Sequence, residues 1–244
     1  MVPLDRIVVV NDGRPYPSSS YPSFLSKVIQ HRFNQGVSAS KNDAFQFLLD
    51  EGCEHIFLAE DDIQVVDSSV YEQYISVSQE SGILHFNYGY HGPANRNSFG
   101  VPQYRKKLSL PSGKNIILNR HVIGAFSYYH RHVLERIGKM DRLFINAYEH
   151  VDHTLRIIKA DYHPPFWWFA DIENSHRMIH DLDTGLTQSI IRKNHFAFNV
   201  RVKLCQRYFK FKHGYLPESY PDIFSESDVE QKIRYLLTIQ SQCR

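Results

Sequence analysis

The chain has 244 residues, of which 42% are hydrophobic and 22% are charged. This apolar content is enough for a folded core, which excludes a disordered tail, a collagen-like rod and a small disulfide-stapled scaffold. Its 28 lysines and arginines against 26 aspartates and glutamates leave a net charge of +2, too small to indicate nucleic-acid binding by bulk charge.

Three widely spaced cysteines, Cys53, Cys205 and Cys243, favour a reducing compartment over a disulfide framework. No run of about 18 apolar residues is present, and Met1 is followed by Val-Pro-Leu-Asp rather than by a basic and then apolar leader. These features predict a cytoplasmic protein.

The hydrophobic pattern alternates strands with helices along the chain. A β-branched run at 6–10 ends at the turn signal Asn11-Asp12-Gly13, which is typical of a strand buried on both faces. Further strands are predicted at 27–33, 55–59 and 83–88, and helices at 38–50, 69–79, 130–137, 149–160 and 225–241. The segment 89–118 is predicted to be mainly loop. Strand, helix, strand with short connections predicts an α/β fold with a mainly parallel sheet, and the absence of repeats or linkers predicts one domain over 1–244.

Three carboxylates, Glu60, Asp61 and Asp62, follow directly on the predicted strand at 55–59. Neighbouring carboxylates repel one another unless a cation or solvent screens them. Ligands of open α/β sheets bind beyond the carboxyl ends of the strands, where a carboxylate pair can hold a divalent ion that neutralises a diphosphate. The alternative is a solvated acidic loop without a function.

The order of these elements resembles the nucleotide-sugar half of GT-A glycosyltransferases, most closely the family 2 enzymes. The resemblance rests on the strand ending Val-Val-Val-Asn-Asp-Gly, on Asn34, Gly36, Ser40 and Asn42 around a helix start, and on Ile-Phe-Leu-Ala-Glu-Asp-Asp. It continues through Gly124-Ala125-Phe126-Ser127 and Tyr148-Glu149-His150-Val151-Asp152, and so covers about residues 6 to 160. It implies a GT-A fold with a mixed, mainly parallel central sheet flanked by helices.

This resemblance divides the chain into a nucleotide-sugar-binding half at about 1–88, an acceptor side at about 89–190 and a basic, aromatic helical appendage at about 190–244. It also implies one more central strand ahead of the run at 6–10, for which the chain offers only five residues. We expect a truncated product, a strand borrowed from a partner or a sheet rebuilt with fewer strands, and favour the first.

The resemblance also implies roles for single residues. Those beside the nucleotide would be Asn11, Asp12, Gly13, Asn34, Gly36, Asn42 and Asp61. Asp62 would approach the metal and the diphosphate with Glu60 beside it, although the family usually has an aspartate in place of Glu60. A third metal ligand would be His180 or His176, and an imidazole ligand suits Mn²⁺ more than Mg²⁺.

Glu149, His150 and Asp152 fall where the family carries its catalytic base, although His150 replaces the usual aspartate. A base takes the proton of the acceptor hydroxyl during in-line attack on the anomeric carbon. We place Glu149 first and His150 second, since histidine titrates near neutral pH. The alternative is that Glu149, Asp152 and Arg156 only cap and pair along a helix start.

These expectations describe a metal-dependent hexosyltransferase that uses Mn²⁺ or Mg²⁺ to move a sugar from a nucleotide-diphospho-sugar, a UDP-sugar, to a glycan or glycolipid with inversion. The resemblance suggests bacterial surface polysaccharide or lipopolysaccharide assembly. The alternatives are a non-catalytic nucleotide-sugar-binding or scaffold domain and a metal-dependent nucleotidyltransferase.

Lysines and arginines alternate with phenylalanines and tyrosines over 190–213. Such a segment can lie on an anionic membrane, which would place the protein at the inner face of that membrane. An amphipathic helix with a solvated basic face is the alternative that we favour. The acidic strand end argues against nucleic acid as a partner.

Overall fold

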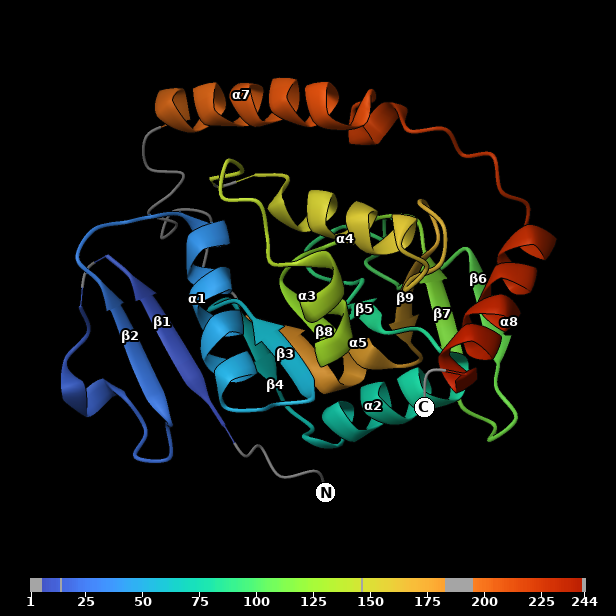
Figure 1. Ribbon diagram of the computed structural model, residues 1–244, viewed down its shortest axis with the longest axis horizontal. Coiled ribbons are helices and arrows are strands. Elements are labelled where there is room, and N and C mark those ends of the chain that lie inside the picture. The colour runs from blue at the N-terminus through green and yellow to red at the C-terminus, as the bar shows by residue number, and fades with distance from the viewer. Residues whose placement is uncertain (1–5, 14, 146, 183–194, 243–244) are drawn as a thin grey trace.

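The computed structural model of the protein describes residues 6–13, 15–145, 147–182 and 195–242. It is a mixed α/β structure (Figure 1). One sheet contains β3 (His55–Ala59), β8 (Phe126–His130) and β5 (His85–Asn87), and a second contains β6 (Lys106–Ser109), β7 (Asn115–Asn119) and β9 (Phe169–Ile172). Two strand pairs join β1 (Val8–Asp12) to β2 (Lys27–His31) and β4 (Ile63–Val65) to β10 (Ile179–Asp181). The helices are α1 (Val37–Asp50), α2 (Ser69–Ser81), α3 (Arg131–Ile137), α4 (Glu149–Lys159), α5 (Ser175–Met178), α7 (His195–His213) and α8 (Glu226–Gln242).

The prediction of a mainly parallel sheet is wrong. Among the described strands, β1 and β2 pair in parallel, whereas β8 runs antiparallel to both β3 and β5. A strand buried on both faces has the same continuous apolar sequence in either direction, so its composition cannot reveal its partner's direction. The loop predicted over 89–118 is also partly wrong, because β6 and the start of β7 fall within it.

Helices cover both faces of the β3–β8–β5 sheet (Figure 1). Successive side chains of a strand point to opposite faces. Ile56 and Leu58 of β3 accordingly pack with α1, α3 and α4, whereas Phe57 packs with α2. In β8, Tyr129 likewise packs on the side of α1, α3 and α4, and Tyr128 packs on the side of α2. Ala44, Phe45 and Leu48, which follow the helical spacing predicted for 38–50, are the residues by which α1 covers the sheet.

The β1–β2 pair lies beside this sheet without pairing to it. Neither β1 nor β3 has a second strand partner among the described residues. Helix α1 packs across both, since Val8 and Val10 of β1 join the same hydrophobic cluster as Phe45 of α1 and Ile56 of β3. Helix α1 thus connects the β1–β2 pair to the β3–β8–β5 sheet through this hydrophobic cluster.

A buried carboxylate, Asp171 of β9, ties the second sheet to the first. It accepts hydrogen bonds from the Tyr74 hydroxyl (2.5 Å), the Gly89 amide (3.0 Å) and the Ser175 hydroxyl (2.7 Å). Burial raises the pKa of Asp171 to about 6 against these donors. The carboxylate thereby joins α2, the segment after β5, β9 and α5.

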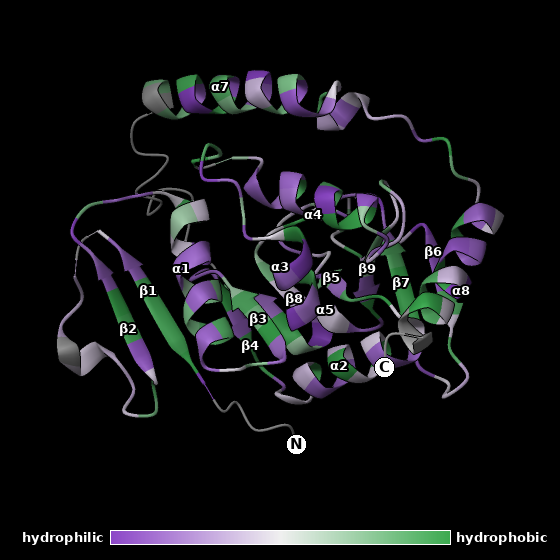
Figure 2. Ribbon diagram, viewed as in Figure 1, coloured by the Kyte–Doolittle hydropathy of each residue, from purple (hydrophilic) through white to green (hydrophobic). Residues whose placement is uncertain are grey.

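The C-terminal part contributes the two helices α7 and α8. α8 packs its apolar side against the core through Val229, Ile233 and Leu236. Figure 2 shows hydrophobic colour concentrated on strands such as β1 and β7 and mixed along α7. Within the described ranges, no helix is both long enough and apolar enough to cross a bilayer.

Candidate functional site

The acidic motif after β3 is tied to the first half of α1. The Glu60 amide donates to the carbonyl of Ala125 at 2.8 Å, which continues the β3–β8 pairing. The Glu60 carboxylate accepts a hydrogen bond from Nζ of Lys41 at 2.6 Å, and Lys41 also donates to the carbonyl of Gly124 at 3.1 Å. Since Lys41 is only 8% exposed, the protein itself must compensate its charge.

Sequence reasoning did not single out Lys41. Burial works to lower the pKa of Lys41, but the charges of Glu60, Glu149 and Asp62 outweigh it and raise the pKa. The lysine is therefore a cation at neutral pH, surrounded by carboxylates from two parts of the chain, the acidic motif after β3 and the start of α4. The sequence did contain a sign that Lys41 is buried. It lies three residues before Ala44 and four before Phe45, which places it on the same buried face of α1.

Glu149 and His150 open α4 beside this lysine. A Cβ on Gly124 would lie 2.8 Å from Cγ of His150, so the two segments approach this closely only because residue 124 is a glycine. Nδ1 of His150 lies 3.3 Å from Oε1 of Glu149. The structure thus brings the acidic motif and the Glu149–His150 pair, predicted from separate parts of the sequence, to one place.

The two groups of this pair differ in their fitness as a base. Glu149 is 5% exposed, and its Oε2 is buried without a hydrogen-bond partner in the described part of the chain. Burial works to raise the pKa of Glu149, but the hydrogen bond and charge of His150 and the charge of Lys41 hold it at about 2. A carboxylate with this pKa is a weak proton acceptor. The His150 side chain is 25% exposed, and its Nε2 makes no hydrogen bond within the described part of the chain.

Asp62 forms a second centre of charge with two residues that the sequence did not indicate. Its Oδ2 lies 3.6 Å from Nε2 of His91, whose Nδ1 lies 2.9 Å from Oδ1 of Asp181. Oδ1 of Asp62 is buried and has no hydrogen-bond partner among the residues that the structure describes. Burial raises the pKa of Asp62 against the opposing charge of His91.

The predicted metal set does not assemble as expected. The pairing of β10 with β4 places Asp181 opposite Ile63 and His180 opposite Gln64, so His180 points away from its neighbour Asp181 and is exposed. Nowhere in the described ranges do three His, Cys, Asp or Glu side chains converge as metal ligands. Glu60, Asp62, His176 and His180 are thus not gathered into one ligand set among the described residues, and metal binding stays a prediction.

The predicted nucleoside-side aspartate, Asp12, holds the turn before α1. Its Oδ1 accepts from Nδ1 of His31 and from the Gln35 amide, both at 2.7 Å, and its Oδ2 accepts from the Gly36 amide at 2.8 Å. Asp12 therefore has a structural role, and its contact with a nucleoside stays a prediction.

The remaining residues predicted beside the nucleotide are spread over the same region. Asn11 donates to Gln30 at 2.9 Å, and Asn34 donates to the Asp12 carbonyl at 3.3 Å. Asn42 exchanges two hydrogen bonds of 2.8 Å with the backbone of Met140, which fixes the loop after α3. Gly13 has a φ of +126°, and Asp61 is exposed in the turn between β3 and β4.

Replacing Gly36 by alanine should destabilise this region strongly. Gly36 has a φ of +94°, and a Cβ there would lie 2.5 Å from the carbonyl oxygen of Ile145. We expect a loss of about 1–3 kcal/mol in the free energy of unfolding beyond that of Gly52→Ala, measured by urea unfolding. Gly52 is the matched control because its φ of +78° is also positive but its Cβ position is open. Equal losses in the two variants would show that the contact with Ile145 is unimportant.

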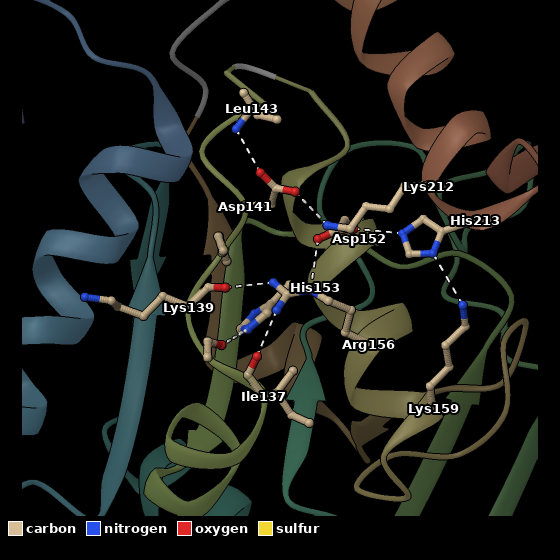
Figure 3. A network of polar contacts seen from close by, with 12 residues as sticks. Ile137, Lys139, Asp141, Leu143, Asp152, His153, Arg156, Lys159, Lys212 and His213 are labelled. Carbon is tan, nitrogen blue, oxygen red and sulfur yellow. Dashed lines mark hydrogen bonds and ion pairs between the residues drawn. The ribbon is translucent and has the colours of Figure 1, made fainter.

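Asp152, predicted among the catalytic residues, anchors α7 instead of opening toward the site. It is fully buried, and its Oδ1 lies 2.8 Å from both Nζ of Lys212 and Nε2 of His213. Its Oδ2 accepts from Nε of Arg156 at 3.1 Å (Figure 3). Because both oxygens are occupied by side chains of α4 and α7, we leave Asp152 out of the groups that could act on a substrate.

A pocket of about 250 Å³ lies apart from the acidic motif, where Arg96, Arg105 and Arg120 line it. Arg105 and Arg120 bind Asp222 at 3.0 and 3.5 Å, and Arg96 donates to the carbonyls of residues 90 and 100. All three guanidinium groups of this pocket therefore already have partners.

Comparison with known proteins does not assign the chain to a family. A scan against protein-family models gives no match, and no curated protein matches the chain.

Proposed function

We propose that the protein transfers a sugar from a nucleotide-diphospho-sugar, a UDP-sugar, to a hydroxyl group of a glycan or glycolipid. The observation that carries this proposal is the meeting of three features around Lys41: the carboxylates after β3, the Glu149–His150 pair at the start of α4, and the buried lysine itself. A carboxylate-rich strand end beside a possible general base is the arrangement that such a transfer requires.

In this proposal His150 is the base and Glu149 positions it. The acceptor oxygen attacks the anomeric carbon, the bond from that carbon to the diphosphate oxygen breaks, and the acceptor proton passes to Nε2 of His150. Glu149, on Nδ1 of the same ring at 3.3 Å, stabilises the imidazolium that forms. This assignment reverses our order from the sequence, where Glu149 came first, because its pKa of about 2 makes it the weaker base.

Asp62 suits a divalent ion that is shared with the donor. Mg²⁺ is commonly held by one or two carboxylates together with substrate phosphates, so a complete cage of protein ligands is not required. The buried, unpartnered Oδ1 of Asp62 is the group that would hold such an ion. The ion would neutralise the charge of the leaving diphosphate.

Thermal melting tests donor binding directly. A ligand at about 100 times its dissociation constant adds roughly 2.7 kcal/mol of stability if it binds only the native state. We expect UDP with Mn²⁺ or Mg²⁺ to raise the melting midpoint of the wild-type protein. The shift should be lost in Asp62→Asn and kept in Asp50→Asn, a control at the exposed end of α1.

Three results would separate the alternatives. A shift that survives Asp62→Asn would contradict the assignment of this residue. A shift with ATP but not with UDP would favour a nucleotidyltransferase. Cooperative melting without a shift for any nucleotide would favour a scaffold role.

A further inference from the structure

Helix α7 presents apolar side chains on two opposite faces. The inner face packs on the α3–α4 loop and on α4, where the rings of Phe144 and Tyr208 lie 4.9 Å apart and Cys205 and Phe209 are buried. The ion network of Asp152 with Lys212 and His213 fixes the same face (Figure 3). The side of α7 that this packing leaves open is therefore well defined.

The outer face carries large apolar side chains that contact water. Phe196 is 81% exposed, Phe211 87%, Leu204 57% and Val200 41%. Their spacing of four, four and seven residues places them within one stripe of the helix. Single exposed apolar residues are common, but an aligned stripe with two phenylalanines exposed by more than four fifths is typical of an interaction surface.

The charge along this face is uniformly positive. Lys203, Arg207 and Lys210 are exposed and lie on the same side of the helix as the stripe. The described side chains supply no ion pair to any of the three, and α7 contains no aspartate or glutamate over His195–His213. A partner that covers this face must be apolar where it meets the phenylalanines and negative where it meets the cations.

We propose that the outer face of α7 binds the surface of an anionic lipid bilayer, with α7 parallel to the membrane plane. Phenylalanine and leucine side chains enter the boundary between headgroups and acyl chains, while lysine and arginine contact the lipid phosphates. A second copy of this chain is disfavoured, because two such faces would bring positive charge against positive charge. Duplex nucleic acid supplies phosphates but no apolar layer for Phe196 and Phe211.

Helix α7 forms an outer layer of the molecule. Figure 1 shows α7 as the outermost helix above α4. Because the inner face is fixed to α4 by Asp152, binding of the outer face would orient the whole protein on the bilayer. The proposal does not depend on sugar transfer and can be tested without a substrate.

The test is co-sedimentation with vesicles of pure phosphatidylcholine and of phosphatidylcholine with about 30% phosphatidylglycerol. We expect binding to the anionic vesicles alone, and weaker binding as added salt shortens the Debye length from about 10 Å at 0.1 M. The triple variant Lys203→Glu, Arg207→Glu, Lys210→Glu should lower the partition coefficient at least about 100-fold, since each cation near the surface contributes roughly a factor of five. Leu204→Ser with Phe211→Ser should lower it about tenfold or more.

Matched controls distinguish an effect of this face from the effects of net charge and of nonspecific hydrophobic binding. The triple variant Lys27→Glu, Lys114→Glu, Arg136→Glu carries the same net charge on exposed positions of other elements, and Phe24→Ser with Phe99→Ser removes exposed rings elsewhere. Both should bind nearly as the wild type does. Equal binding to neutral vesicles, no binding to anionic vesicles, or equal losses in the α7 and control variants would overturn the proposal. Binding of duplex DNA without binding of vesicles would also overturn it.

Discussion

Asp152→Ala is expected to lower the free energy of unfolding by about 3 kcal/mol, because it removes a fully buried carboxylate that pairs with Arg156 and Lys212 and contacts the buried His213. Asp152 is fully buried and receives contacts from Arg156, Lys212 and His213, so no water can take its place at low cost. The docking of α7 on α4 depends on the same group. Unfolding in urea at neutral pH measures the loss.

The control for this variant is Asp161→Ala. Asp161 also pairs with a lysine, Lys232, at 2.5 Å, but its side chain is 40% exposed. Exposed pairs contribute at most about 1 kcal/mol. A loss in Asp152→Ala no larger than in Asp161→Ala would show that the buried network is not a main source of stability.

The pH dependence of stability gives an independent check on Asp152. Burial works against its ionisation, yet the contacts with His213, Lys212 and Arg156 hold the pKa of Asp152 at about 2. An aspartate with a lower pKa in the folded than in the unfolded state stabilises the fold above about pH 4, and this contribution is lost as the pH falls toward 2. The wild-type protein should lose stability over this interval, and Asp152→Ala should lack that component.

The second large effect is expected in the proposed base. His150→Ala should lower the rate of sugar transfer by about 10²–10⁴-fold while the donor still binds, because the acceptor proton loses its acceptor. Glu149→Gln should lower the rate less, because Nε2 of His150 remains as the proton acceptor and only the carboxylate beside Nδ1 is lost. Transfer rates and donor melting shifts across pH 5–9 measure both effects.

The two variants can also contradict the assignment. If Glu149→Gln abolishes transfer and His150→Ala retains it, Glu149 is the base, as we first predicted from the sequence. Full activity in both variants would remove this pair from the mechanism. His132→Ala is a suitable control, since His132 is exposed on α3 and contacts Tyr162 at 3.0 Å.

Much of the fold could be predicted from local pattern. The β-branched run at 6–10 predicted the strand that the structure places at Val8–Asp12, and the apolar pairs of 44 with 48 and 45 with 49 predicted the helix that became α1. The strand β8 was not predicted, and its direction depends on where the chain returns from. β4 and β10 have three residues each, which is too short for a period to be recognised.

The candidate site could also be predicted only in part from the sequence. The acidic motif was recognisable because three adjacent carboxylates after a buried strand repel one another unless a cation or solvent screens their charge. Lys41, His91 and Asp181 were missed because each becomes significant only through a partner that lies far away in the sequence, such as Glu60 for Lys41 and Asp62 for His91. Residues of this kind are identified by proximity in space.

The bridging of β1–β2 to the main sheet by α1 has a consequence for hydrogen exchange. β8 is paired along both edges, so its amides exchange only when much of the molecule opens. The β1–β2 pair has no strand neighbour among the described residues and is held mainly by the packing of α1. Its amides can therefore exchange through a partial opening that leaves β8 protected, which makes the amino-terminal pair a separate cooperative unit within the protein.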